Sequence, residues 1–196
     1  MKRLPAFLSV LMLSFPALAM DATAPVKEVM QAVTTNWQEL PEGSESAVDY
    51  VDYFNEDFLK RLYSQDFVEN YRQAAKYPAY EEGGSPFDYD VIAMGQDGCS
   101  INDLKIAAAA EKEGVSDVAV TFDNTHCFGD RPADWKPTEV HFSVVSQDGR
   151  PVIDDILRIV DGTGESLKKE MKEIAAEGAT MDQQGSGAEP QSDELQ

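Results

Sequence analysis

The middle of the chain contains two segments in which apolar and polar residues alternate on either side of a glycine-containing turn. In the first, KEG at residues 112–114 has the form of a three-residue hairpin loop, with glycine where a left-handed backbone is needed. The resulting register places Ala108 opposite Val118 and Ile106 opposite Val120. A slip of one residue would scramble this sorting of side chains. The pattern therefore predicts an antiparallel hairpin with one apolar face.

The only two cysteines, Cys99 and Cys127, face each other when this register is extended to the open end of the hairpin. Opposed residues on antiparallel strands lie close enough for a disulfide, so we expect a Cys99–Cys127 bridge. A zinc site that adds His126 is the weaker alternative. His126 would point to the opposite face, and no fourth ligand lies at a recognisable spacing. We therefore expect no metal site and no cofactor.

The second hairpin has Asp148-Gly149 as a two-residue turn. Its register places Val144 opposite Ile153, and Phe142 opposite Asp155. A carboxylate at position 155 would then lie on an otherwise apolar face, where its burial is costly unless it is paired. Asp155 is therefore either a hydrogen-bonded structural acid or a general base in a pocket of the sheet.

Apolar residues at spacings of three and four predict amphipathic helices before and after these hairpins. They are expected over residues 24–40, 48–62, 64–77 and 165–177. Gly178 follows the last of them and is expected to stop that helix. Residues 178–196 hold few large apolar side chains and many Gly, Ser and Gln, which predicts a disordered tail.

The first 19 residues have the organisation of a secretory signal peptide. Lys2 and Arg3 precede an apolar run at residues 7–15, and small residues lead to an expected cleavage after Ala19. The run is too short to span a bilayer, and no cysteine follows the cleavage site to carry a lipid. We therefore expect a periplasmic protein, or alternatively a secreted one, with no membrane span or lipid anchor.

Cleavage leaves a length that suits one domain. The expected organisation is a signal peptide at 1–19, an N-terminal helix and linker at 20–46, a single α+β domain at 47–177 and the tail at 178–196. The full chain has 36 acidic and 16 basic residues and a formal charge of -20, and loss of Lys2 and Arg3 makes it more negative. Such a surface repels nucleic acid and attracts cations or a basic protein.

The segment FDYDVIAMGQDGCS at residues 87–100 gathers carboxylates among turn formers. We take Asp88, Asp90, Gln96 and Asp97 as candidate pocket residues. The spacing of the acids does not fit a calcium loop, because apolar residues follow Asp90. The plainer interpretation is a loop in which Asp97 and the next glycine form a turn that leads into the first hairpin.

Two motifs carry a resemblance to a known family. They are FDYDVIAMGQDG at residues 87–98, and VIDDI at 152–156 with GTGESLKKEM downstream. On these motifs the chain resembles the exported bacterial YqhG-like family of unknown function over residues 48–177. The resemblance implies a cystatin-like or nuclear-transport-factor-like curved sheet, and it brings no reaction, substrate or cofactor. The expected fold is therefore α+β, with N-terminal helices packed on a curved antiparallel sheet of two hairpins and a closing C-terminal helix.

No nucleophile elbow, phosphate loop or dinucleotide fingerprint is present, so nothing in the sequence demands an enzyme. We expect an exported, non-enzymatic domain that binds a small ligand or an envelope protein, which could be basic. One alternative is an immunity or inhibitor protein that neutralises a basic toxin or hydrolase. Another is a small-pocket isomerase or dehydratase with Asp155 as the general base.

Overall fold

A computed structural model describes residues 20–40, 43, 49–81 and 84–186. Within them the chain forms an antiparallel sheet in which each of five strands pairs with the next in sequence. The strands are β1 (Asn102–Ala108), β2 (Val115–Asp123), β3 (Thr138–Gln147), β4 (Arg150–Val160) and β5 (Thr163–Ser166). The helices are α1 (Thr23–Asn36), α2 (Glu56–Leu62), α3 (Gln65–Ala74) and α4 (Leu167–Ser186). The predicted α+β class, with a closing helix after the strands, is confirmed. The predicted signal peptide at 1–19 lies outside the described residues.

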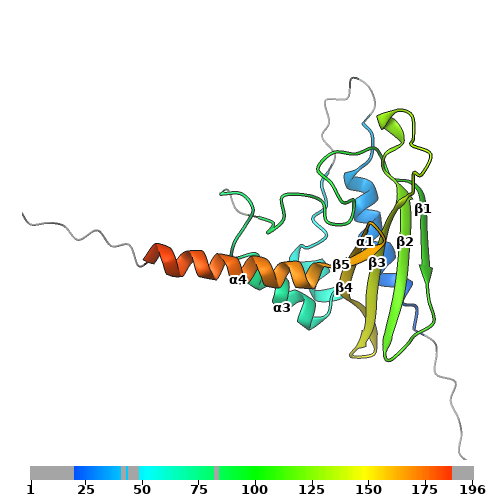
Figure 1. The fold of residues 1–196 in the computed structure, drawn as a ribbon. Coiled ribbons are helices and arrows are strands. Elements are labelled where there is room, and N and C mark those ends of the chain that lie inside the picture. The colour runs from blue at the N-terminus through cyan, green and yellow to red at the C-terminus, as the bar shows by residue number, and fades with distance from the viewer. Residues whose placement is uncertain (1–19, 41–42, 44–48, 82–83, 187–196) are drawn as a thin grey trace, which may run out of the picture.

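The helices pack on one face of the sheet (Figure 1). Helix α1 lies against the strands, whereas α4 leads away from the sheet with α3 running beside it. Alternate side chains of β2 and β3 are completely buried beneath these helices, as an alternating pattern requires. They are Val118, Val120, Phe122, Val140, Phe142 and Val144. None of the helices in the described part of the chain combines the length and the apolar character that crossing a bilayer requires.

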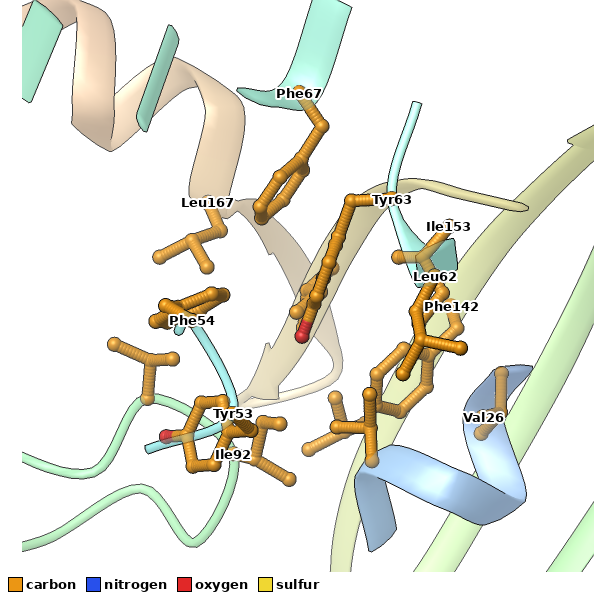
Figure 2. Close-up of a cluster of buried hydrophobic side chains, with 14 of the residues drawn as sticks. Val26, Tyr53, Phe54, Leu62, Tyr63, Phe67, Ile92, Phe142, Ile153 and Leu167 are labelled. Atoms are coloured by element: carbon orange, nitrogen blue, oxygen red, sulfur yellow. The ribbon is translucent and has the colours of Figure 1, made fainter. Parts of the chain in front are cut away.

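An aromatic cluster joins the helices to the sheet (Figure 2). Phe54 lies at its centre, with neighbouring ring centroids 4.8 to 6.1 Å away. These neighbours are Tyr53, Tyr63, Phe67, Tyr71 and Phe87. Val26 of α1 and Leu167 of α4 belong to the same core. Helix α1 therefore shares one hydrophobic core with the sheet and the other helices.

The first hairpin has the predicted register over most of its length. Ile106 pairs with Val120 and Ala108 with Val118. The turn is shorter than predicted, because Glu113 and Gly114 alone form it, both with positive φ. A shift of register near Asp103 disturbs the other end of β1. The predicted Cys99–Cys127 disulfide is nevertheless present, with the two Cα atoms 5.7 Å apart.

The second hairpin follows the predicted register only as far as Val144 and Ile153. A β-bulge then shifts the pairing by one residue, so that Phe142 pairs with Ile156. The prediction that Asp155 lies opposite Phe142 on the apolar face is therefore wrong. Such a bulge places two residues of one strand opposite one residue of its partner, and it reverses the side on which later side chains lie. Arg158 becomes the charged residue on the buried face, where it is 8% exposed.

Helix α2 is shorter than predicted, because residues 49–55 are not helical. The side chain of Asn55 starts the helix by accepting hydrogen bonds from the backbone N–H groups of Asp57 and Phe58. Asn55 and Asp52, three residues before it, both have side chains that bond to nearby backbone N–H groups, and such residues are unfavourable inside a helix. Residues 49–55 are therefore non-helical, and several of them line the cleft described below.

Helix α4 continues through Gly178 to Ser186, so the predicted helix stop at Gly178 is wrong. A Cβ atom at position 178 would lie 2.2 Å from the ring of Tyr77. The glycine therefore permits close packing instead of ending the helix. Of the tail predicted to be disordered, residues 178–186 are helical and 187–196 lie outside the described residues.

Strand β5 was not predicted. It follows Asp161 and Gly162, which both have positive φ and form the same type of two-residue turn as Asp148 and Gly149. Strand β5 is only four residues long and mostly exposed, so it has no alternating apolar pattern by which it could be recognised.

Reduction of the disulfide should destabilise the protein by about 3 to 4 kcal/mol, because the bridge closes a loop of 28 residues in the unfolded chain. Chemical unfolding with and without reductant measures this difference. The Cys99→Ser/Cys127→Ser variant should match the reduced protein and should not respond to reductant. Equal stability of the oxidised and reduced proteins would contradict the expectation.

Candidate functional site

A cleft of about 830 Å³ lies beside the aromatic core. Its walls come from the end of α1, the non-helical segment before α2, one residue of α3 and the loop before β1. The lining residues are Asn36, Trp37, Tyr50, Asp52, Tyr53, Phe54, Tyr71, Tyr80, Gly84, Ser85, Phe87, Asp88, Tyr89, Asp90, Gly95 and Gln96. Among these residues there are many aromatic rings and three carboxylates, and there is no lysine, arginine or histidine.

Asn36 fixes the segment before α2 against the end of α1. Its side-chain amide donates to the carbonyl oxygen of Val51 at 2.9 Å and accepts from the backbone N–H of Val51 at 2.7 Å. The carboxylate of Asp52 then accepts from the backbone N–H of Phe54 at 2.8 Å and closes a turn. These bonds direct Phe54 into the core and leave Tyr50 and Asp52 at the cleft.

Asp90 joins three walls of the cleft. One carboxylate oxygen accepts from the indole N–H of Trp37 at 2.9 Å, and the other accepts from the hydroxyl of Tyr53 at 2.9 Å. That second oxygen also accepts from the backbone N–H groups of Ile92 and Ala93. Asp90 therefore has donors on both oxygens and acts as the frame of the cleft.

Trp37 is also held from its other side by Gly98. A Cβ atom at position 98 would lie 2.4 Å from the indole ring, so only glycine leaves room for this contact. Gly98 is adjacent to Cys99, whose disulfide ties the end of the loop to the segment after β2. The loop is thus anchored at Asp90 within it and at Gly98 and Cys99 near its end.

The carboxylates of Asp88 and Asp52 have fewer hydrogen-bond partners than the carboxylate of Asp90. The backbone carbonyl of Asp88 accepts from the side chain of Gln96 at 2.7 Å, whereas its carboxylate has no hydrogen bond or ion pair with any described residue. The carboxylate of Asp52 is bonded only to the backbone N–H of Phe54, and no described cation pairs with it. Both side chains are exposed.

Tyr89 connects the cleft wall to α4 and the sheet. Its hydroxyl donates to Glu170 at 3.0 Å, and Glu170 pairs with Arg158 at 2.6 Å. The guanidinium of Arg158 lies 5.6 Å from the centroid of the Tyr89 ring, within cation–π range. Burial raises the pKa of Glu170 above its ordinary value, although Arg158 opposes this rise.

The pKa values of two tyrosines at the cleft are raised mainly by burial, and nearby carboxylates add to the effect. Burial raises the pKa of Tyr71 to about 12, and the charge of Asp52 adds to the effect. Burial likewise raises the pKa of Tyr53 well above its ordinary value, with Asp90 as the next cause. A negative charge near a phenol disfavours phenolate and would favour a bound cation.

Three of the five candidate pocket residues from the sequence meet in this cleft: Asp88, Asp90 and Gln96. Asp97 instead lines a separate cavity of about 300 Å³ beside β3. Sequence reasoning missed Trp37, Tyr50, Asp52 and Tyr80. One signal could have found Tyr50 and Asp52. Asp52 and Asn55 favour side-chain bonds to the backbone, which argues against the first part of the helix predicted over residues 48–62.

Asp155 lines neither this cleft nor the cavity that contains Asp97. Its carboxylate accepts from the hydroxyl of Ser166 at 2.6 Å and from the backbone N–H of Lys168 at 3.1 Å. It also accepts from the backbone N–H of Ile156 at 2.8 Å. These bonds connect the β4 bulge to the start of α4, which favours the interpretation of Asp155 as a structural acid.

His141 lies on the outer face of the sheet between two carboxylates. Its ring nitrogens are 2.8 Å from Asp117 and 2.9 Å from Glu139. Partial burial acts to lower the pKa of His141, but the bonds to Glu139 and Asp117 outweigh burial and raise the pKa above its ordinary value. The described residues contain no group of three or more histidines, cysteines or acids placed to hold a metal ion.

Comparison of the chain with protein-family models, with curated proteins and with solved structures gives no match. The likeness to the YqhG-like family therefore remains a proposal. The candidate site rests on its own geometry.

Replacement of Asp90 by alanine should lower the free energy of unfolding by about 2 to 4 kcal/mol, because it leaves the buried hydroxyl of Tyr53 and the indole of Trp37 without an acceptor. Asp88→Ala is the matched control. The Asp88 carboxylate has no described partner, so its loss should change stability by about 0.5 kcal/mol or less. Urea unfolding followed by tryptophan fluorescence measures both, and equal effects would contradict the assignment.

The contribution of His141 to stability should be larger in acid than in base. The pKa of His141 is higher in the folded protein than in the unfolded chain, so folding favours its protonated form. The resulting stabilisation is fully present below the unfolded-state pKa and is lost as the pH rises through the folded-state pKa. The difference in free energy of unfolding between the wild type and His141→Gln should therefore be greater at about pH 5.5 than at about pH 9. The opposite order would contradict this expectation.

Proposed function

We propose that the protein is an exported, non-enzymatic binding domain whose ligand occupies the cleft between Asp90 and Tyr50. The observation that carries this proposal is the cleft itself, in which exposed aromatic rings and unpaired carboxylates stand on a rigid, hydrogen-bonded frame. Concave sites of this kind, with apolar walls and a few converging polar groups, are where proteins bind ligands.

Export is supported by two independent features. The first 19 residues have the pattern of a signal peptide, and the Cys99–Cys127 pair forms a disulfide of the kind that persists in oxidising compartments. The proposed location is therefore the periplasm, with secretion as the alternative.

The alternatives from the sequence do not have equal support. An immunity or inhibitor protein for a basic partner is compatible with the unpaired acids of the cleft, since such acids attract a cationic surface. A reaction that uses Asp155 as a general base has no support from the contacts of Asp155, which hold the start of α4.

The two tryptophans give a direct test. The indole N–H of Trp37 lies in the cleft, bonded to Asp90, whereas the indole N–H of Trp135 is bonded to Thr125 in the β2–β3 loop. A soluble fragment library should contain members that shift the Trp37 indole resonance in ¹H–¹⁵N spectra of the oxidised protein and leave that of Trp135 in place.

Tyr50→Ala is the matched variant for this screen. Tyr50 is 70% exposed, so its loss should leave stability nearly unchanged and weaken the binding of cleft ligands. The proposal fails if no fragment shifts the Trp37 resonance, or if the fragments that do so bind Tyr50→Ala as tightly as the wild type.

A further inference from the structure

We propose that the ligand of the cleft is an organic cation, an ammonium or guanidinium group on an apolar chain. This inference rests on the proposed function, because it takes the cleft as the binding site and adds the chemical class of what is bound. Three independent properties of the lining residues lead to it: the exposure of its rings, the state of its carboxylates and the position of the basic residues.

The first property is a pair of exposed tyrosine rings at the cleft. Tyr50 is 70% exposed and Tyr80 is 57% exposed, although both are large aromatic side chains. Neither ring is needed to fill the core, which is formed by Phe54 and its buried neighbours. The face of an aromatic ring attracts cations, and ammonium and guanidinium groups are the ligands that such rings bind best.

The second property is the availability of negative charge. The carboxylates of Asp52 and Asp88 line the cleft without an ion pair to any described residue. Asp90 adds a third negative charge behind them, although its oxygens are already occupied by donors. A cation bound in the cleft would therefore meet uncompensated charge.

The third property is that several basic side chains form ion pairs outside the cleft. Arg61 lies between Glu28 and Asp57, Lys168 lies between Asp66 and Asp154, and Arg158 pairs with Glu170. No lysine or arginine lines the cleft. The described part of the protein thus offers the cleft no internal cation, and an external one can take that place.

The same properties argue against other ligand classes. An anion would be repelled by the three carboxylates. A bare metal ion is usually held by several converging ligands, and the described residues contain no group of three or more acids, histidines or cysteines placed to hold one. A neutral apolar ligand could contact the rings but would bury carboxylates without compensation, which is unfavourable.

The cation could belong to a free polyamine or to a lysine or arginine side chain of a basic protein. Both sources present the same chemistry to the cleft. We use N-acetyl-lysine methylamide and spermidine as probes, with N-acetyl-norleucine methylamide as the neutral counterpart that keeps the apolar chain and lacks the ammonium group. Because spermidine carries three positive charges and the lysine probe one, the two sources are compared with a capped tri-lysine peptide that matches the charge of spermidine. Tighter binding of spermidine than of this peptide would identify a free polyamine, and tighter binding of the peptide would identify protein side chains.

Titrations followed at the Trp37 indole resonance should give dissociation constants for both cations that are at least fivefold lower than for the norleucine probe. Asp88→Asn should weaken binding of the lysine probe about fivefold, because it removes one of the two unpaired negative charges that line the cleft. Tyr80→Leu should weaken it about two- to fivefold. Tyr80→Phe keeps the ring and loses only the long bond of 3.4 Å from the Tyr80 hydroxyl to the carbonyl oxygen of Asp88, so it should bind nearly like the wild type. Asp134→Asn changes the net charge equally outside the cleft and should have no effect.

Three outcomes would overturn the inference: equal binding of the lysine and norleucine probes, equal effects of Asp88→Asn and Asp134→Asn, or binding of neutral fragments alone. In each of them a ligand still shifts the Trp37 resonance, so the proposed binding function would stand while its cationic ligand would be wrong. If no cation and no library fragment shifts that resonance, both proposals fail together.

Discussion

The hydrogen bonds to Asp90 are the interaction on which the candidate site depends. Three separate parts of the chain, the end of α1, the segment before α2 and the loop before β1, are all joined at this one carboxylate. A carboxylate that accepts several N–H and O–H bonds is well satisfied even when it is partly buried. Burial of the aromatic core supplies the larger part of the stability, and the bonds to Asp90 hold the walls of the cleft together at the edge of that core.

The sequence predicted the parts of the fold that alternate regularly. The pairing of Val118 with Ala108 and of Val144 with Ile153 followed from turn chemistry and the two-residue period. The disulfide was predicted by extending the first register, although that register shifts near Asp103 and Cys127 lies in a short 3-10 helix. The bulge beside Asp155 could not be predicted in this way, because one inserted residue leaves the local pattern plausible in either register. Its cause is a tertiary contact, because the carboxylate of Asp155 accepts hydrogen bonds from Ser166 and from the backbone N–H of Lys168 at the start of α4.

The candidate site was predicted only in part, for a related reason. Asp88, Asp90 and Gln96 stood out because they lie close together in the sequence. Tyr50 and Asp52 did not, because the apolar spacing around them also fits a helix and the local bonds of Asp52 and Asn55 compete with that helix. Residues that meet through tertiary contacts carry no local signal, and the rings of Trp37 and Tyr80 belong to this group.

The contact between Trp37 and Gly98 has a consequence for the energetics of recognition. The loop that carries Asp88 and Gln96 is restrained by Asp90 within it, by the indole packed on Gly98, and by the covalent bond at Cys99. Its conformational entropy is therefore lost when the protein folds and the disulfide forms. A ligand that enters the cleft meets a preorganised surface, and more of its contact energy is expressed as affinity.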